Sequence, residues 1–553
     1  MIVRLLLFIS LLGGTLMLSA QPTISSAGIV NAASYAYPGM PNGPIAEGSI
    51  FTLFGNGVGP AQIQFASSFP LPTTLGGTSV SVTVNGSTLQ CPLLYSSAKQ
   101  VAAILPSAIP IGTGTARVTY NGATSNTSPI TVVKSSPGLF TVNQQGAGQG
   151  AVQDGGGGEN SAFYSFAPGQ QVVIWGTGLG PIGGSDAAPP PSGNLPSVLV
   201  TASVGAQQAN VIYAGRSQNA GEDQINVVIP SGVSGCFVPV SVTVANPDGS
   251  NPVTSNWVSI AVAASGKLCS DQLLTNEGLQ NLQNGGVWRV GVIELVRSFT
   301  QTSWPGSPTL TSTSDTAIGM FSKYDGTLAT NGDFGRFDLS DGGCYVVEVN
   351  GSSAGRLRTI NLDAGPVINL NGPNGPKQLT KSFQVYTADL GDISDIFGTK
   401  GPLYLDPGTY ALDNGSGGAD VQGFRMNITV ASPFTWTNMN SINNVSRNQP
   451  LPITWTGGDP NATVLIEGTT VLDSNGHSVS FFCQARDSAG SLTVPASILR
   501  QLPPSGNLGT DSVPIPGGSL LVETTTSSAG SAPGMDVLTG TATSGYNKTV
   551  VWQ

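Results

Sequence analysis

The chain has 553 residues, which is enough for roughly three to four domains of ordinary size. Only 9% of the residues are charged, and the formal net charge is −10. The sequence contains no lysine- or arginine-rich cluster, which excludes a nucleic-acid binder, because such a protein needs a basic patch. The single histidine, His477, allows at most one Ser–His or Cys–His pair and nearly excludes histidine-based metal sites.

The composition predicts an all-β chain with little helix. Glycine (74 residues) and proline (39 residues) make up about a fifth of the sequence. Runs of four to eight residues rich in Val, Thr and Ile are separated by Gly, Pro and Asn turns, as in short antiparallel strands. The hydrophobic content of 39% is too high for a disordered acidic tail. The glycines have no three-residue period, so collagen is also excluded.

The first twenty residues have the pattern of a secretory signal peptide. Arg4 precedes a short apolar run, and the small residues Ser19 and Ala20 follow it. We expect cleavage near Ala20, and we expect the mature chain to be secreted or held at the cell envelope or surface. No later stretch is apolar enough to span a bilayer, so the mature chain is predicted to have no membrane span.

Five cysteines are present in a chain that we expect to be exported, where disulfides are stable. Cys236 and Cys269 bracket a predicted strand pair at one domain end and are the first disulfide candidates. Cys344 and Cys483 are a second candidate pair. The odd count leaves one cysteine over, and Cys91 is expected to be a buried, small apolar residue.

An internal repeat organises the first half of the chain. The stretch AEGSIFTLFGNGVGP at residues 46–60 matches APGQQVVIWGTGLGP at residues 167–181 with a constant offset of 121. Tyr95 also aligns with Tyr213. Each copy has several strand-like runs with turn signals between them, which predicts two tandem immunoglobulin-like antiparallel β-sandwiches of about 100–120 residues.

Two details support this assignment. Asn85-Gly86 within SVSVTVNGSTLQ predicts a tight hairpin. The segment QVAAILP at residues 100–106 aligns with QINVVIP at residues 224–230. Both copies then end in paired strand-like runs.

These motifs, together with IVNAASY and SSPGLFT, resemble the Solibacter-type C-terminal domain family of acidobacterial secreted proteins over about residues 24–263. The similarity to the wider IPT/TIG immunoglobulin-like group is looser. The stretches LDAGPVINLNGPNG, GGADVQGF and ITWTGGDP resemble tail segments that recur in the same proteins. The resemblance implies a sandwich fold and export, and it implies no reaction, since the family has no established activity. The module lies near the N-terminus here, which departs from the family pattern.

Composition shifts divide the remaining chain. A Gly/Ser-rich boundary lies at residues 261–271, and a second one lies near ASPFTWTNMN. Short helices are expected in LLTNEGLQNLQ, DISDIF and LTVPASILRQLP. The expected divisions are 1–20 signal peptide, 21–140 first immunoglobulin-like repeat, 141–264 second immunoglobulin-like repeat, 265–432 β-rich domain, and 433–553 C-terminal β-sandwich-like domain.

Two glycine motifs imitate known sites. The G-x-G-x-G runs at residues 55–59 and 176–180 lack the spacing and the following helix of a dinucleotide loop, so we interpret them as strand-to-loop bends. Residues 351–355 match G-x-S-x-G but lie between two strand-like runs, whereas a nucleophile elbow requires strand–turn–helix. The only available base, His477, lies in a distant turn. No catalytic triad is therefore predicted.

Calcium is the one cofactor that the sequence brings into question. Carboxylates in glycine- and asparagine-rich loops can ligate Ca²⁺, but no EF-hand or RTX spacing is present, and solvated turns are the favoured interpretation. The aspartates concerned are Asp325, Asp333, Asp338, Asp341, Asp389, Asp392 and Asp395.

Glu294, Glu348 and Glu467 lie within strand-like runs and could supply the paired carboxylates of a glycosidase. Spacing alone brings no two of them together, so solvent-facing strand positions are favoured.

Tryptophans offer a sugar-stacking surface, because an aromatic face has a large area and loses little entropy on binding. Trp436 and Trp455 are the candidate stacking residues, with Trp288 and Trp304 as further members. Tryptophan is also a normal sandwich-core residue, and a core location is the favoured interpretation for each of them.

The resulting prediction is a non-catalytic secreted or cell-surface protein with a structural, binding or adhesive role. The partner is a surface, protein or glycan that the sequence does not name. The alternative is a carbohydrate-binding module array, and the third possibility is a secreted polysaccharide hydrolase with paired carboxylates.

Overall fold

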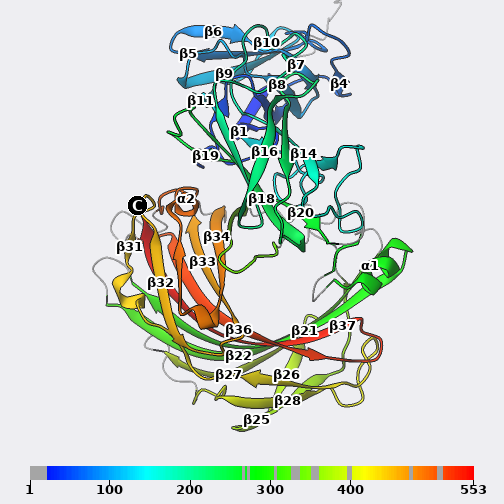
Figure 1. The fold of residues 1–553 in the computed structure, drawn as a ribbon, viewed down its shortest axis with the longest axis vertical. Helices are drawn as coiled ribbons and strands as arrows, with labels where there is room; N and C mark the ends of the chain where they lie inside the picture. The colour runs from blue at the N-terminus through cyan, green and yellow to red at the C-terminus, as the bar shows by residue number, and fades with distance from the viewer. Residues whose placement is uncertain are drawn as a thin grey trace, which may run out of the picture.

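A computed structural model describes residues 21–264, 268–270, 274–303, 308–325, 337–349, 360–394, 401–472, 477–506 and 515–553. The fold is mostly β, with 54% strand and 4% helix, so the predicted all-β class of tandem immunoglobulin-like sandwiches is confirmed. Two repeats and a larger C-terminal unit (residues 274–553) follow one another along the long axis (Figure 1).

The first repeat is a sandwich of two sheets around a buried apolar core. Asn85 and Gly86 have φ angles of 50° and 80°, so the predicted tight hairpin joins two strands here, with Val84 opposite Ser87. One sheet has the order β1-β3-β8-β7-β4 and the other β2-β11-β9-β5-β6. The strands are β1 (Thr23–Asn31), β2 (Ile45–Ala46), β3 (Ile50–Asn56), β4 (Gln64–Phe65), β5 (Thr78–Val84), β6 (Ser87–Gln90), β7 (Leu93–Ser96), β8 (Gln100–Ile104), β9 (Gly112–Tyr120), β10 (Ala123–Thr124) and β11 (Ser128–Val133).

The second repeat reproduces this arrangement at the predicted offset. Its strand β14 (Gln171–Thr177) begins and ends 121 residues after β3. One strand, β16, runs unbroken where the first repeat has β6 and β7, which are separated at Pro92, a residue that has no N–H to donate. The other strands are β12 (Gly138–Leu139), β13 (Val152–Asp154), β15 (Leu199–Val204), β16 (Gln207–Arg216), β17 (Asp223–Val228), β18 (Gly235–Ala245), β19 (Val253–Thr254) and β20 (Val258–Val262).

The C-terminal unit differs from the sequence-based division at residue 432. A single 14-stranded sheet, in the order β23-β34-β33-β36-β37-β21-β22-β27-β26-β25-β28-β29, joins strands from both sides of that position. The joint is a parallel pairing of β21 with β37, from Val290 opposite Val537 to Gln301 opposite Lys548. The composition shift near residue 432 indicated a linker. The strands that pair across this position are too far apart in sequence for their pairing to leave a local signal. The strands of this sheet are β21 (Val287–Thr302), β22 (Leu310–Asp325), β23 (Cys344–Val349), β25 (Val367–Gly372), β26 (Gly375–Ser382), β27 (Val385–Ser394), β28 (Gly408–Asp413), β29 (Arg425–Val430), β33 (Thr463–Val471), β34 (Ser478–Arg486), β36 (Gly518–Gly530) and β37 (Val537–Trp552), with β24 (Ile360–Asn361) and β31 (Asn444–Val445) paired at its sides.

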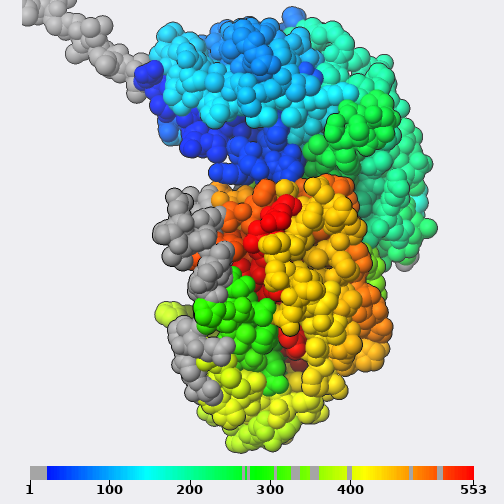
Figure 2. All heavy atoms as spheres, turned by 90° about the vertical axis from the view of Figure 1, so that its left-hand side faces the viewer, coloured from blue at the N-terminus to red at the C-terminus, as the bar shows by residue number. Residues whose placement is uncertain are grey.

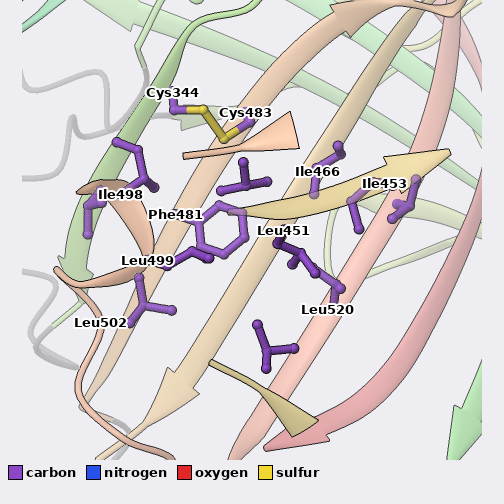
Figure 3. Close-up of a cluster of buried hydrophobic side chains, with 14 of the residues drawn as sticks. Cys344, Leu451, Ile453, Ile466, Phe481, Cys483, Ile498, Leu499, Leu502 and Leu520 are labelled. Carbon is purple, nitrogen blue, oxygen red and sulfur yellow. A yellow bond between two sulfur atoms is a disulfide. The ribbon is translucent and has the colours of Figure 1, made fainter. Parts of the chain in front are cut away.

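Two cores lie on one face of this long sheet. At one end the sheet curls so that β29 packs against β36 and β37. At the other end a three-stranded sheet covers β33 and β34, and its strands are β30 (Phe434–Trp436), β32 (Leu451–Gly457) and β35 (Ser491–Val494). Figure 3 shows this second core, in which Phe481 and Ile466 of the long sheet meet Leu451 and Ile453 of the small one.

Short helices are few among the described residues. The first predicted helix is α1 (Asn276–Gln283), whose N-cap Thr275 accepts a hydrogen bond from the Gly278 N–H. The third is α2 (Ala496–Leu499), which begins after Pro495. The DISDIF prediction is wrong where it is described, since Asp392–Ser394 belong to β27.

Both candidate cysteine pairs are disulfides in the structure. Cys236 bonds to Cys269, and Cys344 bonds to Cys483 directly across β23 and β34. Cys91 is a buried free thiol in the core of the first repeat.

Candidate functional site at the domain junctions

The junction between the two repeats is built around a fully buried ion pair. Arg216, on β16, pairs with Asp223 on β17, and both side chains are 0% exposed. The second amino group of Arg216 donates to the carbonyl oxygen of Gly48 in the first repeat (2.9 Å) and to that of Gly180 (2.6 Å). Burial raises the pKa of Asp223, while Arg216 opposes this shift. A buried charge is tolerated only with such partners. The pair itself lies within the second repeat, and the hydrogen bond from Arg216 to Gly48 ties it to the first repeat.

The junction between the second repeat and the C-terminal unit has its own small core. Cys236–Cys269, helix α1 and Trp288 pack together there. The carboxylate of Asp338 accepts the backbone N–H of Phe237 (2.9 Å), and the Asp338 N–H donates to the Phe237 carbonyl (2.8 Å). Covalent, apolar and backbone contacts therefore fix this second junction as well.

A third contact closes the molecule between the first repeat and the C-terminal unit. Figure 2 shows the N-terminal residues, in blue, directly above the C-terminal unit, in orange. Between them and the second repeat lies a cavity of about 170 Å³, which we call the junction cavity. This volume is roughly ten times the ~15 Å³ that one water molecule needs. The cavity is lined by residues of all three parts, among them Tyr35, Asn42, Asn256, Trp257, Glu348 and Arg500.

Glu348 is the titratable group that joins two of these parts. Both of its carboxylate oxygens face the backbone N–H of Tyr37, at 3.2 and 3.4 Å. The ring of Tyr37 also lies 5.1 Å from that of His477. Burial raises the pKa of Glu348 to about 7, against the opposing effects of the Tyr37 N–H and of His477. This end of the junction is therefore sensitive to pH near neutrality.

Trp257 anchors the second repeat to the same place. Its indole N–H donates to the side-chain oxygen of Gln501 (2.8 Å), and its ring joins the core of the C-terminal unit. Sequence reasoning missed Trp257, because nothing in its local pattern distinguishes an interface tryptophan from a core one.

The predicted stacking role of Trp436 and Trp455 is wrong. Their side chains are 3% and 2% exposed in the core of the C-terminal unit. The indole N–H of Trp436 donates to Asn438 (2.8 Å), and that of Trp455 donates to the Asp487 carbonyl (2.8 Å). Neither ring has a face available to a sugar. Trp288 is also buried, and Trp304 lies outside the described residues.

The three glutamates named from the sequence do not share one site. Glu467 lies opposite Phe482, whereas Glu348 lies opposite Val479, an odd number of residues away on β34, so they point to opposite faces of the sheet. The register places Glu294 on the face of Glu467, together with Glu523. Burial, and then repulsion from Glu467 and Glu294, raises the pKa of Glu523 to about 7.

The described aspartates hold loops rather than gather together. Asp341 pairs with Arg486 at 3.0 Å, and Asp389 accepts the Gly391 N–H at 3.2 Å. Within the described ranges, no group of three acidic, histidine or cysteine side chains could hold a metal ion. Asp333 and Asp395, and the side chain of Asp325, lie outside the described residues.

The glycine motifs behave as bends where they are described. Gly57 and Gly178 have φ angles of 65° and 98°, values that favour glycine, so the predicted strand-to-loop bends are confirmed. The G-x-S-x-G stretch at 351–355 lies outside the described residues. In the part of the chain that is described, no helix is long and apolar enough to cross a membrane.

Comparisons with known proteins show similarity only among solved structures. No family model matches the chain, and no curated protein matches it. Similar structures include a pair of titin immunoglobulin domains (10% identity, 44% of this chain and 98% of that chain, TM-score 0.12). Others are immunoglobulin domains 1–4 of Sidekick-1 (12%, 96% and 98%, 0.13) and domains 4–9 of the surface layer protein SbsC (12%, 95% and 66%, 0.12). TM-scores this low support no functional conclusion, and the fold assignment rests on the strand pairing.

Proposed function

We propose that this protein is a non-catalytic secreted or cell-surface scaffold that holds binding surfaces in a fixed relative orientation. The observation that carries the proposal is the construction of the junctions. The Arg216–Asp223 pair fixes one, and the Cys236–Cys269 disulfide with the Phe237–Asp338 contacts fixes the next. Domains within a chain move relative to one another unless their interface is extensive and specific. Junctions held by a buried ion pair and a disulfide keep the domain surfaces in fixed relative positions. Such a chain is suited to presenting those surfaces to a partner.

An extracellular location fits the same chemistry. Disulfides persist in oxidising compartments and are rare in the cytosol. The N-terminal signal peptide pattern leads to the same compartment. When the chain is expressed with its own leader in a bacterial host, we expect the exported fraction to contain a protein that begins at Gln21. Mass spectrometry of the intact N-terminus measures this. An uncleaved chain in the cytosol contradicts export.

The binding role is tested on the purified mature chain. The protein is mixed with intact bacterial cells and with insoluble polysaccharides, and two quantities are measured, namely loss of protein from the supernatant and release of reducing ends. We expect loss of protein without reducing ends. A steady release of reducing ends would overturn the non-catalytic proposal.

The hydrolase alternative rests on one observation, the pKa of Glu523, which repulsion from Glu467 and Glu294 helps to raise to about 7. Glycosidases use one protonated and one ionised carboxyl group. If reducing ends appear, Glu523→Gln and Glu467→Gln distinguish this site from a contaminant, because each must abolish their release while Glu159→Gln, at an exposed position, must not.

A further inference from the structure

A second concave surface lies between the two repeats, away from the long sheet. It has a volume of about 600 Å³, within the ~300–1,000 Å³ range of small-molecule sites. We call it the inter-repeat groove. The first repeat and the second repeat each supply about half of its lining, which includes Tyr35, Tyr95, Phe140, Gln153, Trp175 and Glu222.

Four aromatic residues contribute to the lining of the groove and remain partly accessible. Tyr35, Tyr95, Phe140 and Trp175 all line it, and each is only partly buried. The row continues beyond the groove, because the ring of Phe65 lies 5.7 Å from that of Tyr95 and Phe65 is 64% exposed. Phe65 therefore presents a further exposed ring beside Tyr95, next to the groove.

Polar side chains form hydrogen bonds with these rings and lie along the rim of the groove. The Trp175 indole N–H donates to the side-chain oxygen of Gln153 (3.0 Å), and the Gln100 amide donates to the Tyr95 hydroxyl (2.6 Å). Ser217 and Asn219 donate to one oxygen of Glu222, at 2.6 and 2.9 Å. The rings and the carboxylate are thus oriented before any ligand arrives, which lowers the entropy lost on binding.

The base of the groove is rigid. Ile50, Ile104 and Ala220 form a buried cluster between the repeats, directly against groove residues Ala32, Leu94 and Phe140. Tyr35 and Gln144 have left-handed backbones, with φ of 52° and 56°. This conformation is unfavourable for a non-glycine residue, so the surrounding structure imposes it.

The charge of the lining residues limits which chemical class of ligand can bind in the groove. No lysine, arginine or histidine is among the residues that line the groove, Glu222 is acidic, and the chain carries a net charge of −10. Phosphorylated or acidic ligands are therefore disfavoured. A purely apolar ligand would make no use of the hydrogen-bonding groups that the amides and the carboxylate place along the groove. A pyranose ring has a face of C–H groups and a rim of hydroxyls, which match aromatic faces bordered by amide and carboxylate groups.

We propose that the inter-repeat groove binds a neutral saccharide chain, with Tyr95 and Trp175 stacking against sugar rings and Gln153 and Glu222 hydrogen-bonding to hydroxyls. This proposal rests on the proposed non-catalytic binding function and gives it a ligand class and a site. The site is separate from Trp436 and Trp455, and it requires both repeats to be held together.

Affinity electrophoresis of the full mature chain tests the proposal, with gels containing soluble mixed-linkage β-glucan, xylan, glucomannan or dextran. We expect at least one of these neutral polysaccharides to retard the protein, and polygalacturonate not to do so. Trp175→Ala and Tyr95→Ala should each weaken binding about tenfold or more, as central aromatic anchors do. Trp175→Phe should retain most of the affinity, because it preserves an aromatic face.

Two controls keep the result interpretable. Phe383→Ala removes an aromatic side chain that is 98% exposed elsewhere and should leave binding unchanged. Glu222 lies in a loop and not in a strand, so Glu222→Ala should weaken binding without unfolding the repeat. This variant tests the groove even if Trp175→Ala unfolds the repeat. Absence of retardation by every neutral polysaccharide, or full binding by the Tyr95 and Glu222 variants, overturns the saccharide proposal. In that case, binding to cells that survives enzymatic removal of their glycans leaves the scaffold function standing with a protein partner. Release of reducing ends instead overturns the scaffold function itself.

Discussion

The two repeats and the C-terminal unit bury the apolar faces of their sheets in different ways. In each repeat, the sheets enclose a core made from within about 120 residues. In the C-terminal unit, β21 and β37 pair over a separation of about 250 residues, and two cores share one sheet. The repeats are therefore separable by sequence, and the C-terminal unit is one cooperative structure.

The largest expected effect comes from dividing the chain at the two kinds of boundary. A fragment of residues 21–270 retains both repeat cores and should unfold cooperatively. A fragment of residues 274–432 loses β37, together with Leu538 and Ala542 of its core, and should show no cooperative transition. Calorimetry on both fragments measures this. A sharp melting transition in the second fragment would show that the boundary at 432 separates true domains after all.

Breaking the buried pair at the junction of the two repeats should cost about 3–5 kcal/mol of unfolding free energy. Arg216→Met leaves Asp223 buried without its partner, which is the expensive outcome for such pairs. Urea denaturation measures the loss. The matched control is Arg486→Met, which removes the exposed Arg486–Asp341 pair and should cost less than about 1 kcal/mol. Equal losses in both variants would mean that the junction is not held by Arg216.

The two disulfides should contribute unequally. Replacing Cys344 and Cys483 with serine opens a loop of 139 residues, while replacing Cys236 and Cys269 opens one of 33. Chain entropy predicts losses of about 4 kcal/mol for the shorter loop and about 5 kcal/mol for the longer one. Denaturation of the two double variants under identical conditions gives the difference. A larger loss of unfolding free energy for the Cys236/Cys269 variant would contradict the chain-entropy explanation. It would mean that this disulfide stabilises the protein through the packing of the junction core.

The smallest expected effect is the pH response of the contact between the first repeat and the C-terminal unit. The pKa of Glu348 is raised to about 7 in the folded protein, so folding favours its protonated form. Its stabilising contribution is complete below about pH 4.5 and is lost as the pH rises through 7. Glu348→Gln should therefore stabilise the protein by about 1–2 kcal/mol at pH 8 and by little at pH 4.5. Thermal melts at both pH values, with Glu159→Gln as the exposed control, measure the effect, and equal shifts at both values would contradict it.

Local signals account for what the sequence predicted correctly. The constant offset placed β14, Asn85-Gly86 placed a hairpin, and Thr275 and Pro495 lie at the starts of the two α-helices. The hairpin and the helix starts depend on neighbours within a few residues, and the offset follows from comparing the two copies of the repeat.

Long-range geometry accounts for what was missed. Trp436 and Trp455 were candidates for a sugar-stacking surface with a sandwich core as the favoured location, and β30 and β32 place both in a core. Tyr95 and Trp175 line one groove because the two repeats dock on each other through contacts between residues far apart in the sequence. The position of a tryptophan in the chain says little about which side of a sheet another sheet will cover.

The parallel pairing of β21 with β37 also sets the order of biogenesis. When residues 287–302 leave the ribosome, the strand that must lie beside them is still about 235 residues from synthesis. Loop closure over such a distance is slow, so this part of the polypeptide stays open for longer than either repeat. Export through a narrow translocon requires an unfolded polypeptide. The C-terminal unit meets this requirement, because it cannot complete its sheet before its last strand has been synthesised.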